Sequence, residues 1–124
     1  MNLLLDTSAF LYWSRADSLI PAVWVETIVD PANTVFISAV SAWEIAIKRK
    51  VGKLVFDGST THAATFHGFT WIDITPVEAE AAGDLDWTHR DPFDRMLVAQ
   101  AAHRRLVLVT SDAALKTAPG VRTL

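Results

Sequence analysis

The segment Asn2-Leu3-Leu4-Leu5-Asp6-Thr7-Ser8 decides the fold class. Its apolar run is stopped by an acidic residue and two hydroxyl residues, which is typical of a buried strand that leads into a helix N-cap. A second apolar run, Leu106-Val107-Leu108-Val109, is followed in the same way by Thr110-Ser111-Asp112. We therefore expect buried strands at residues 2–5 and 106–109, each followed by a helix.

The rest of the chain continues this alternation. Further strands are expected at residues 35–37 and 71–74 and, at the end of the chain, at 121–124. Helices are expected at residues 8–14, 17–29, 60–67, 91–105 and 111–116, with one from Ser38 or Ser41 to residue 50 and another that begins at Pro76. Because strands alternate with helices, we predict a three-layer α/β/α fold whose parallel sheet is covered on both faces, with residues 1–124 as one domain.

The composition excludes several classes of protein. Of the 124 residues, 51% are hydrophobic and 20% are charged, which is too apolar for a disordered chain. There is no cysteine, so disulfides, thiolate zinc sites and cysteine nucleophiles are excluded. No apolar run approaches the ~20 residues of a membrane span, and the N-terminus lacks the basic region of a signal peptide. We expect a cytoplasmic protein without membrane contact.

The charge balance argues against a nucleic-acid partner at first sight. The formal net charge is −3, from 14 acidic and 11 basic residues, whereas most nucleic-acid binders are basic. The exception is a protein in which a cluster of acids serves a separate purpose.

Several acids stand where a protein core needs none: Asp6, Glu44, Asp91, Asp94 and Asp112. Asp6 and Asp112 each follow a predicted strand, and the carboxyl ends of parallel strands meet at one edge of a sheet, where ligands bind. Glu44 lies in an otherwise apolar helical stretch about two turns beyond the second strand. We expect these side chains to converge.

Each acid also has a purely structural interpretation. Asp6 or Ser8 could cap the first helix, and Ser111 or Asp112 the last. Asp91 followed by proline is a favoured N-cap pair, which would occupy its carboxylate locally and leave Asp94 projecting freely. Glu44 could be partly exposed and paired with a lysine four residues later.

The acids taken together favour a metal site. Converging carboxylates raise one another's pKa, so they stay ionised together only around a cation. Oxygen ligands alone indicate Mg²⁺ or Mn²⁺, and such sites hydrolyse phosphodiesters with a metal-activated water.

Four segments in this order carry a resemblance to a known family: Leu3-Leu4-Leu5-Asp6-Thr7-Ser8, Ser41-Ala42-Trp43-Glu44-Ile45, the thirteen residues from His89 to Ala101, and Val109-Thr110-Ser111-Asp112. Over nearly the whole chain they resemble PIN-domain proteins and, more narrowly, the VapC-type toxins of bacterial toxin–antitoxin pairs. The resemblance implies a Mg²⁺-dependent endoribonuclease that acts on RNA and is neutralised by a cognate VapB-type antitoxin; we also expect a homodimer. It assigns catalysis and the metal to Asp6, Glu44, Asp94 and Asp112, with Thr7 or Ser8, Asp91 and Ser111 in support.

Three alternatives remain at this stage. A receiver-like phospho-switch has the same length and a parallel sheet with acids at its edge, but here Asp6 has no acidic neighbour and no lysine directly follows the strand at residues 106–109. A PIN-like scaffold without activity would not need all four acids. A zinc site at His62 and His67 lacks further ligands, and we interpret His89 as a loop residue.

The first two helices also predict a partner surface. Phe10, Leu11, Tyr12 and Trp13 form an apolar run that we expect cannot all face one core, and Val23, Trp24 and Ile28 follow closely. An exposed apolar patch of this kind marks an interface.

Overall fold

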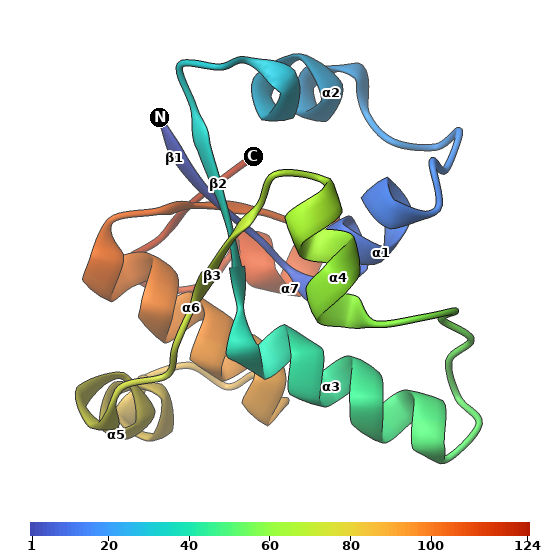
Figure 1. Cartoon of the computed structure of the whole chain (residues 1–124). Coiled ribbons are helices and arrows are strands. Elements are labelled where there is room, and N and C mark those ends of the chain that lie inside the picture. Colours follow the sequence, from blue (N-terminus) through green and yellow to red (C-terminus); the bar gives the residue numbers. More distant parts are fainter.

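The computed structural model describes residues 1–124 and contains a five-stranded parallel sheet in the order β3-β2-β1-β4-β5 (Figure 1). The strands are β1 (Asn2–Leu5), β2 (Thr34–Ser38), β3 (Thr70–Ile72), β4 (Val107–Val109) and β5 (Arg122–Thr123). β1 lies in the centre, with Leu4 in register with Phe36 of β2 and with Leu108 of β4. The ends of β1 and β4 therefore lie side by side, as the sequence predicts.

Seven helices surround the sheet: α1 (Thr7–Ser14), α2 (Ala22–Val29), α3 (Ala39–Lys50), α4 (Thr60–Phe66), α5 (Pro76–Asp84), α6 (Pro92–Arg104) and α7 (Ala113–Lys116). α1, α2 and α4 cover one face, whereas α6 and α7 cover the other and α5 packs against α6 (Figure 1). α3 continues directly from β2. The predicted three-layer α/β/α architecture is confirmed. None of the helices has the length and apolar character that a membrane span requires.

The central strand supplies both halves of the core. Leu3 and Leu5 pack into the cluster beneath α1, α2 and α4, while Leu4 packs against α6 and α7 on the opposite face. This alternation follows from the two-residue period of a strand, and all three leucines are fully buried. Because β1 is buried on both faces, its position is fixed, and so is that of the residue that follows it.

Most boundaries differ from the predicted ones by one or two residues, and the start of α2 differs by more. The helix expected from residue 17 begins only at Ala22, because Pro21 occupies the N-cap with an extended ψ of 139° and disfavours a helical conformation at Ile20 before it. Asp17 instead accepts a hydrogen bond from the backbone N–H of Leu19 in a turn. The third strand ends at Ile72, two residues earlier than expected.

The apolar run on α1 is more buried than expected. Phe10 and Leu11 belong to the core cluster of this face, and Tyr12 and Trp13 pack against the same cluster. The expectation that one core cannot accommodate these four residues is therefore wrong. The core accommodates them because α4, α2 and the segment at residues 54–56 all contribute to the same cluster.

Candidate metal centre

Asp6 lies at the junction of β1 and α1, at the edge of the sheet where the strands end. Its side chain caps α1 by accepting a 2.7 Å hydrogen bond from the N–H of Ala9, and only 4% of the residue is exposed. Burial raises the pKa of Asp6 to about 6, although hydrogen bonds from Thr110 and Ala9 oppose the shift. The charges of Asp94 and Asp112 raise this pKa further. Asp6 is thus a cap and also a buried acid close to two others.

Glu44 reaches the same region from the second turn of α3. It is buried, accepts a 2.6 Å hydrogen bond from the hydroxyl of Thr7 and forms an ion pair with Lys48. Thr7 also shares a 2.9 Å hydrogen bond with the hydroxyl of Ser41. The pairing with Lys48 is as the sequence suggests, but Glu44 is not partly exposed. Of the two candidate hydroxyls, Thr7 faces Glu44, whereas Ser8 is exposed.

Asp91 and Asp94 occupy the first turn of α6 in different ways. Asp91 is the N-cap and accepts hydrogen bonds from the N–H groups of Phe93 and Asp94, at 2.9 and 3.4 Å, while Pro92 fills the first helical position. The sequence predicts that Asp94 projects freely, and this is wrong. Its Oδ2 lies 2.7 Å from Nε2 of His89. Burial raises the pKa of Asp94, the His89 contact opposes the shift, and the charges of Asp91 and Glu44 add to it.

Asp112 follows β4 and caps α7. Its side chain accepts a 2.9 Å hydrogen bond from the N–H of Ala114, and its own N–H donates to the hydroxyl of Thr110. Both Asp112 and the neighbouring Ser111 are exposed. The cap position anticipated for Asp112 is therefore occupied, with one carboxylate oxygen committed to the helix.

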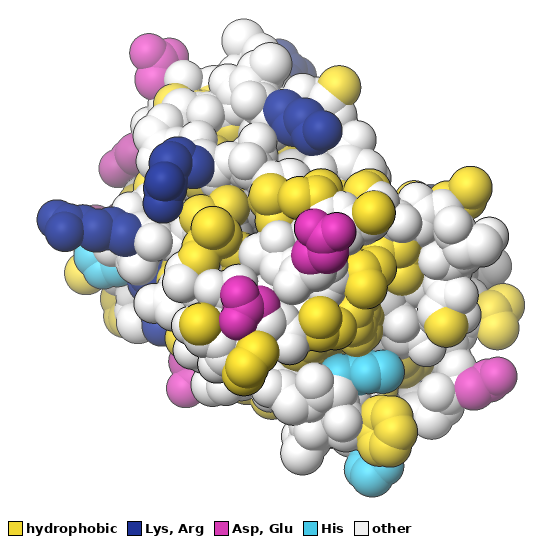
Figure 2. Space-filling view, turned by 90° about the horizontal axis from the view of Figure 1, so that it is seen from above, with side chains coloured by type: hydrophobic (Ala, Val, Ile, Leu, Met, Phe, Trp, Pro, Cys, Tyr) yellow, Lys and Arg dark blue, Asp and Glu magenta, His cyan; other side chains and the backbone are white.

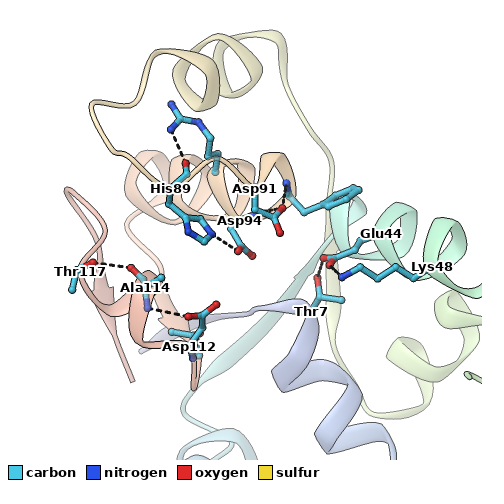
Figure 3. Close-up of polar contacts among 12 residues, drawn as sticks. Thr7, Glu44, Lys48, His89, Asp91, Asp94, Asp112, Ala114 and Thr117 are labelled. Atoms are coloured by element: carbon cyan, nitrogen blue, oxygen red, sulfur yellow. Dashed lines mark hydrogen bonds and ion pairs between the residues drawn. The ribbon is translucent and has the colours of Figure 1, made fainter. Parts of the chain in front are cut away.

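The four acids lie at the carboxyl edge of the sheet, near enough to act on one another electrostatically, but the only group of three or more potential ligands within 4.8 Å of one another is His89, Asp91 and Asp94. Figure 3 shows Glu44 of α3, Asp94 of α6 and Asp112, the N-cap of α7, on the sides of one space, with Asp91 beside Asp94. Asp6 belongs to the same group, because the charges of both Asp94 and Asp112 act on it. These side chains come from four separate segments of the sequence, and only the parallel sheet brings them together.

The sequence did not identify His89 as part of this group. Its ring lies against that of Trp87, with centroids 4.7 Å apart and planes tilted by 30°, and it contacts Asp94; potential ligand atoms of His89, Asp91 and Asp94 lie within 4.8 Å of one another.

The PIN domain family model matches residues 3–121. The chain belongs to the PIN domain family. Among curated proteins, no sequence matches this PIN domain. Its fold is similar to those of solved toxin–antitoxin complexes, and because the sequences are less than 25% identical, the likeness concerns the fold alone.

VapBC2 from Rickettsia felis, bound to a DNA fragment from its promoter, has a TM-score of 0.74 at 18% identity, over 100% of this chain and 98% of that chain. DNA-bound VapBC from Salmonella typhimurium has a TM-score of 0.68 at 18% identity, over 100% and 97% of the two chains. A toxin–antitoxin complex from Klebsiella pneumoniae has a TM-score of 0.64 at 22% identity, over 96% and 94%.

Proposed function

We propose that this PIN domain is the toxin of a VapBC-type pair and cleaves RNA internally with the help of a divalent cation. The observation that carries the proposal is the electrostatic proximity of four carboxylates, from the β1–α1 junction, α3, α6 and the N-cap of α7, at the edge of the sheet where ligands bind in α/β folds.

The donor set fits a hard cation. Asp6, Glu44, Asp94 and Asp112 offer only oxygen atoms, which suit Mg²⁺ and, as a second choice, Mn²⁺. Burial and like charges raise the pKa values of Asp6 and Asp94, so both carboxylates are poorly stabilised without a positive charge between them. A cation would relieve this repulsion.

The site residues would have separate roles in holding a cation and in orienting its ligands. Asp6, Glu44, Asp94 and Asp112 would hold the cation, with Thr7 and Lys48 fixing the carboxylate of Glu44. A bound cation supplies an activated water and offsets negative charge on the scissile phosphate. As the likeness to PIN-domain proteins implies, we expect direct attack by water and products with 5′-phosphate and 3′-hydroxyl ends.

An exposed apolar face supports an antitoxin partner. Val23, Val25 and Val29 of α2 are 49%, 40% and 61% exposed, and Leu19 just before the helix is 87% exposed. Figure 2, which views the molecule from the α2 side, shows hydrophobic side chains gathered across this surface. We place the antitoxin on this α2 face rather than on Trp24 and Ile28, which are buried, because large exposed apolar patches mark interfaces.

The α2 face can be tested with a matched pair of variants. Val29→Asp places a charge on the α2 face and should weaken binding of the antitoxin encoded next to this gene by about tenfold or more. Val77→Asp, at an equally exposed valine on α5, should leave the affinity unchanged. Equal affinities in titration calorimetry would place the antitoxin elsewhere.

A homodimer is supported by a second apolar stripe. Trp43 and Ile47 of α3 and Val51 at its C-cap follow one another at four-residue intervals and are 59%, 38% and 61% exposed. We propose that this stripe pairs with a second copy of the chain, which light scattering of the purified protein would detect as twice the monomer mass.

A PIN-like scaffold without activity is the competing function, and a cleavage assay separates the two. Antitoxin-free protein should cut RNA in Mg²⁺ and not in EDTA, and Glu44→Gln should reduce the rate by about 100-fold while the exposed Glu80→Gln does not. Full activity in EDTA, or 2′,3′-cyclic phosphate ends, would contradict the metal-activated water. No cleavage of any RNA by the metal-loaded protein would favour the scaffold.

A further inference from the structure

The side chain of Arg95, next to Asp94 in α6, donates only to main-chain carbonyls. A guanidinium has five N–H groups, and here all five are used, at 2.8 to 3.1 Å. The acceptors are the carbonyl oxygens of Ala82, Gly83, Leu85, Trp87 and His89. No carboxylate pairs with Arg95. An arginine used in this way organises backbone and is not free to bind a phosphate.

These bonds fix a segment that has little structure of its own. Ala82 and Gly83 lie in the last turn of α5, whose carbonyls have no partners within the helix. Between α5 and the cap of α6, the only backbone hydrogen bond within residues 85–90 joins the N–H of Trp87 to the carbonyl of Leu85. The course of this segment therefore depends mainly on Arg95.

The segment ends on the candidate metal centre. Arg95 donates to the carbonyl of His89 at 3.1 Å, the ring of Trp87 packs at a tilt against the imidazole, and Nε2 of His89 lies 2.7 Å from Oδ2 of Asp94. Because an ionised carboxylate only accepts hydrogen bonds, His89 is the donor. One oxygen of Asp94 is thus held in place, which sets the direction in which the other oxygen points.

We propose that Arg95 and His89 are positioning residues for the metal centre: Arg95 folds residues 82–89 so that His89 orients the carboxylate of Asp94 toward Asp6 and Asp112. This inference rests on the proposed function and adds two residues that do not themselves touch the cation. Partners that orient a metal ligand through a hydrogen bond typically affect metal affinity by about 10–100-fold when removed.

The test measures Mn²⁺ binding by electron paramagnetic resonance, which does not depend on RNA or on activity. Arg95→Lys keeps the charge but loses the planar five-donor fork, and it should raise the Mn²⁺ dissociation constant by about tenfold or more. His89→Ala should do the same. Arg90→Lys is the matched control, because Arg90 lies in the same segment, is exposed and has no side-chain hydrogen bond or ion pair, so the Mn²⁺ affinity of this variant should equal that of the wild type.

A double variant separates positioning from general stability. If Arg95 acts through His89, Arg95→Lys combined with His89→Ala should bind Mn²⁺ no more weakly than His89→Ala alone. Losses that multiply would show that Arg95 acts by another route and would overturn the proposal. So would a lower melting temperature in Arg95→Lys with unchanged Mn²⁺ affinity, since that is a purely structural role.

The outcomes also separate this inference from the proposed function. A wild-type protein that binds no Mn²⁺ would refute the metal centre, and this inference with it. If the wild type binds Mn²⁺ and folded His89→Ala binds it equally tightly, the positioning role is refuted and the metal centre is not. Should Arg95→Lys fail to fold, His89→Ala and His89→Gln decide the question, with partial recovery expected in the glutamine variant because its amide also donates.

Discussion

Replacing Asp6 with asparagine is expected to make the metal-free protein more stable. In the folded protein the pKa of Asp6 is about 6, above its ordinary value of 3.8, chiefly because of burial. An acid whose pKa is raised by folding opposes folding once it is ionised. Its unfavourable contribution is absent below about pH 4, grows as the pH rises, and is complete above about pH 6. Asparagine removes the charge and still caps α1.

The expected gain follows from the size of the shift. A displacement of about two pKa units corresponds to about 3 kcal/mol at neutral pH. The hydrogen bond from Thr110 is weaker when an amide accepts it, which reduces this gain in the free energy of unfolding by about 1 kcal/mol. For a domain of this length, 1 kcal/mol moves the melting temperature by about 4 °C, so Asp6→Asn should melt about 8 °C higher than the wild type in EDTA at pH 7.5.

Calorimetry in EDTA from pH 4 to pH 8 tests the prediction. The wild type should lose stability as the pH rises from 4 to 6, whereas Asp6→Asn should lose much less. Asp30→Asn is the control, because Asp30 is exposed and also accepts a hydrogen bond from a nearby backbone N–H. Mg²⁺ should stabilise the wild type more than Asp6→Asn. If Asp6→Asn melts below the wild type in EDTA at pH 7.5, capping outweighs repulsion and the reasoning is wrong.

Two further predictions concern the two acids in the first turn of α6 and the ion pair between Glu78 and Arg104. Asp91→Asn should keep the wild-type melting temperature and most of the wild-type kcat/KM, because asparagine caps as well as aspartate. Asp94→Asn should stay folded and lose about 100-fold in kcat/KM at saturating Mg²⁺. Equal losses of kcat/KM in the two variants would make Asp91 a ligand too. Burial alone would raise the pKa of Glu78, but its bonds to Arg104 and others outweigh burial and lower it to about 2. The stabilisation from Glu78 should therefore be complete above about pH 4.5 and disappear as the pH falls toward 2. Arg104→Gln should lose about 3 kcal/mol at pH 7 in urea unfolding, and an unchanged midpoint would show that the pair contributes nothing.

The fold was predictable because its signals are local. Runs such as Leu3–Leu5 are strands bounded by capping residues, and the order of strands and helices fixes a parallel sheet. The start of α2 was missed because Asp17 resembles a cap, whereas Pro21 determines where the helix can begin. The burial of Tyr12 and Trp13 was missed because it depends on α4 and on residues 54–56, which are distant in sequence.

The candidate site was predictable only in part, for a physical reason. Each acid can be recognised from its local sequence, because an acid after a strand or within an apolar helix is unusual. The contacts that orient the acids cannot be recognised in this way. The bonds from Arg95 end on main-chain carbonyls, which every residue has, so nothing in the sequence identifies the acceptors. The burial of Glu78 likewise depends on Gln100 and Arg104, which lie more than twenty residues away.

A crystal structure grown with Mn²⁺ and measured at the manganese absorption edge would show whether the four carboxylates hold a cation. We expect an anomalous peak in the space between Asp6, Glu44, Asp94 and Asp112, with the nearest carboxylate oxygens at about 2.1 Å, the distance that Mg²⁺ also adopts. His89 should stay on Asp94 and outside the coordination sphere. A peak bound through the His89 nitrogen and remote from Asp6, or no peak at saturating Mn²⁺, would contradict this expectation.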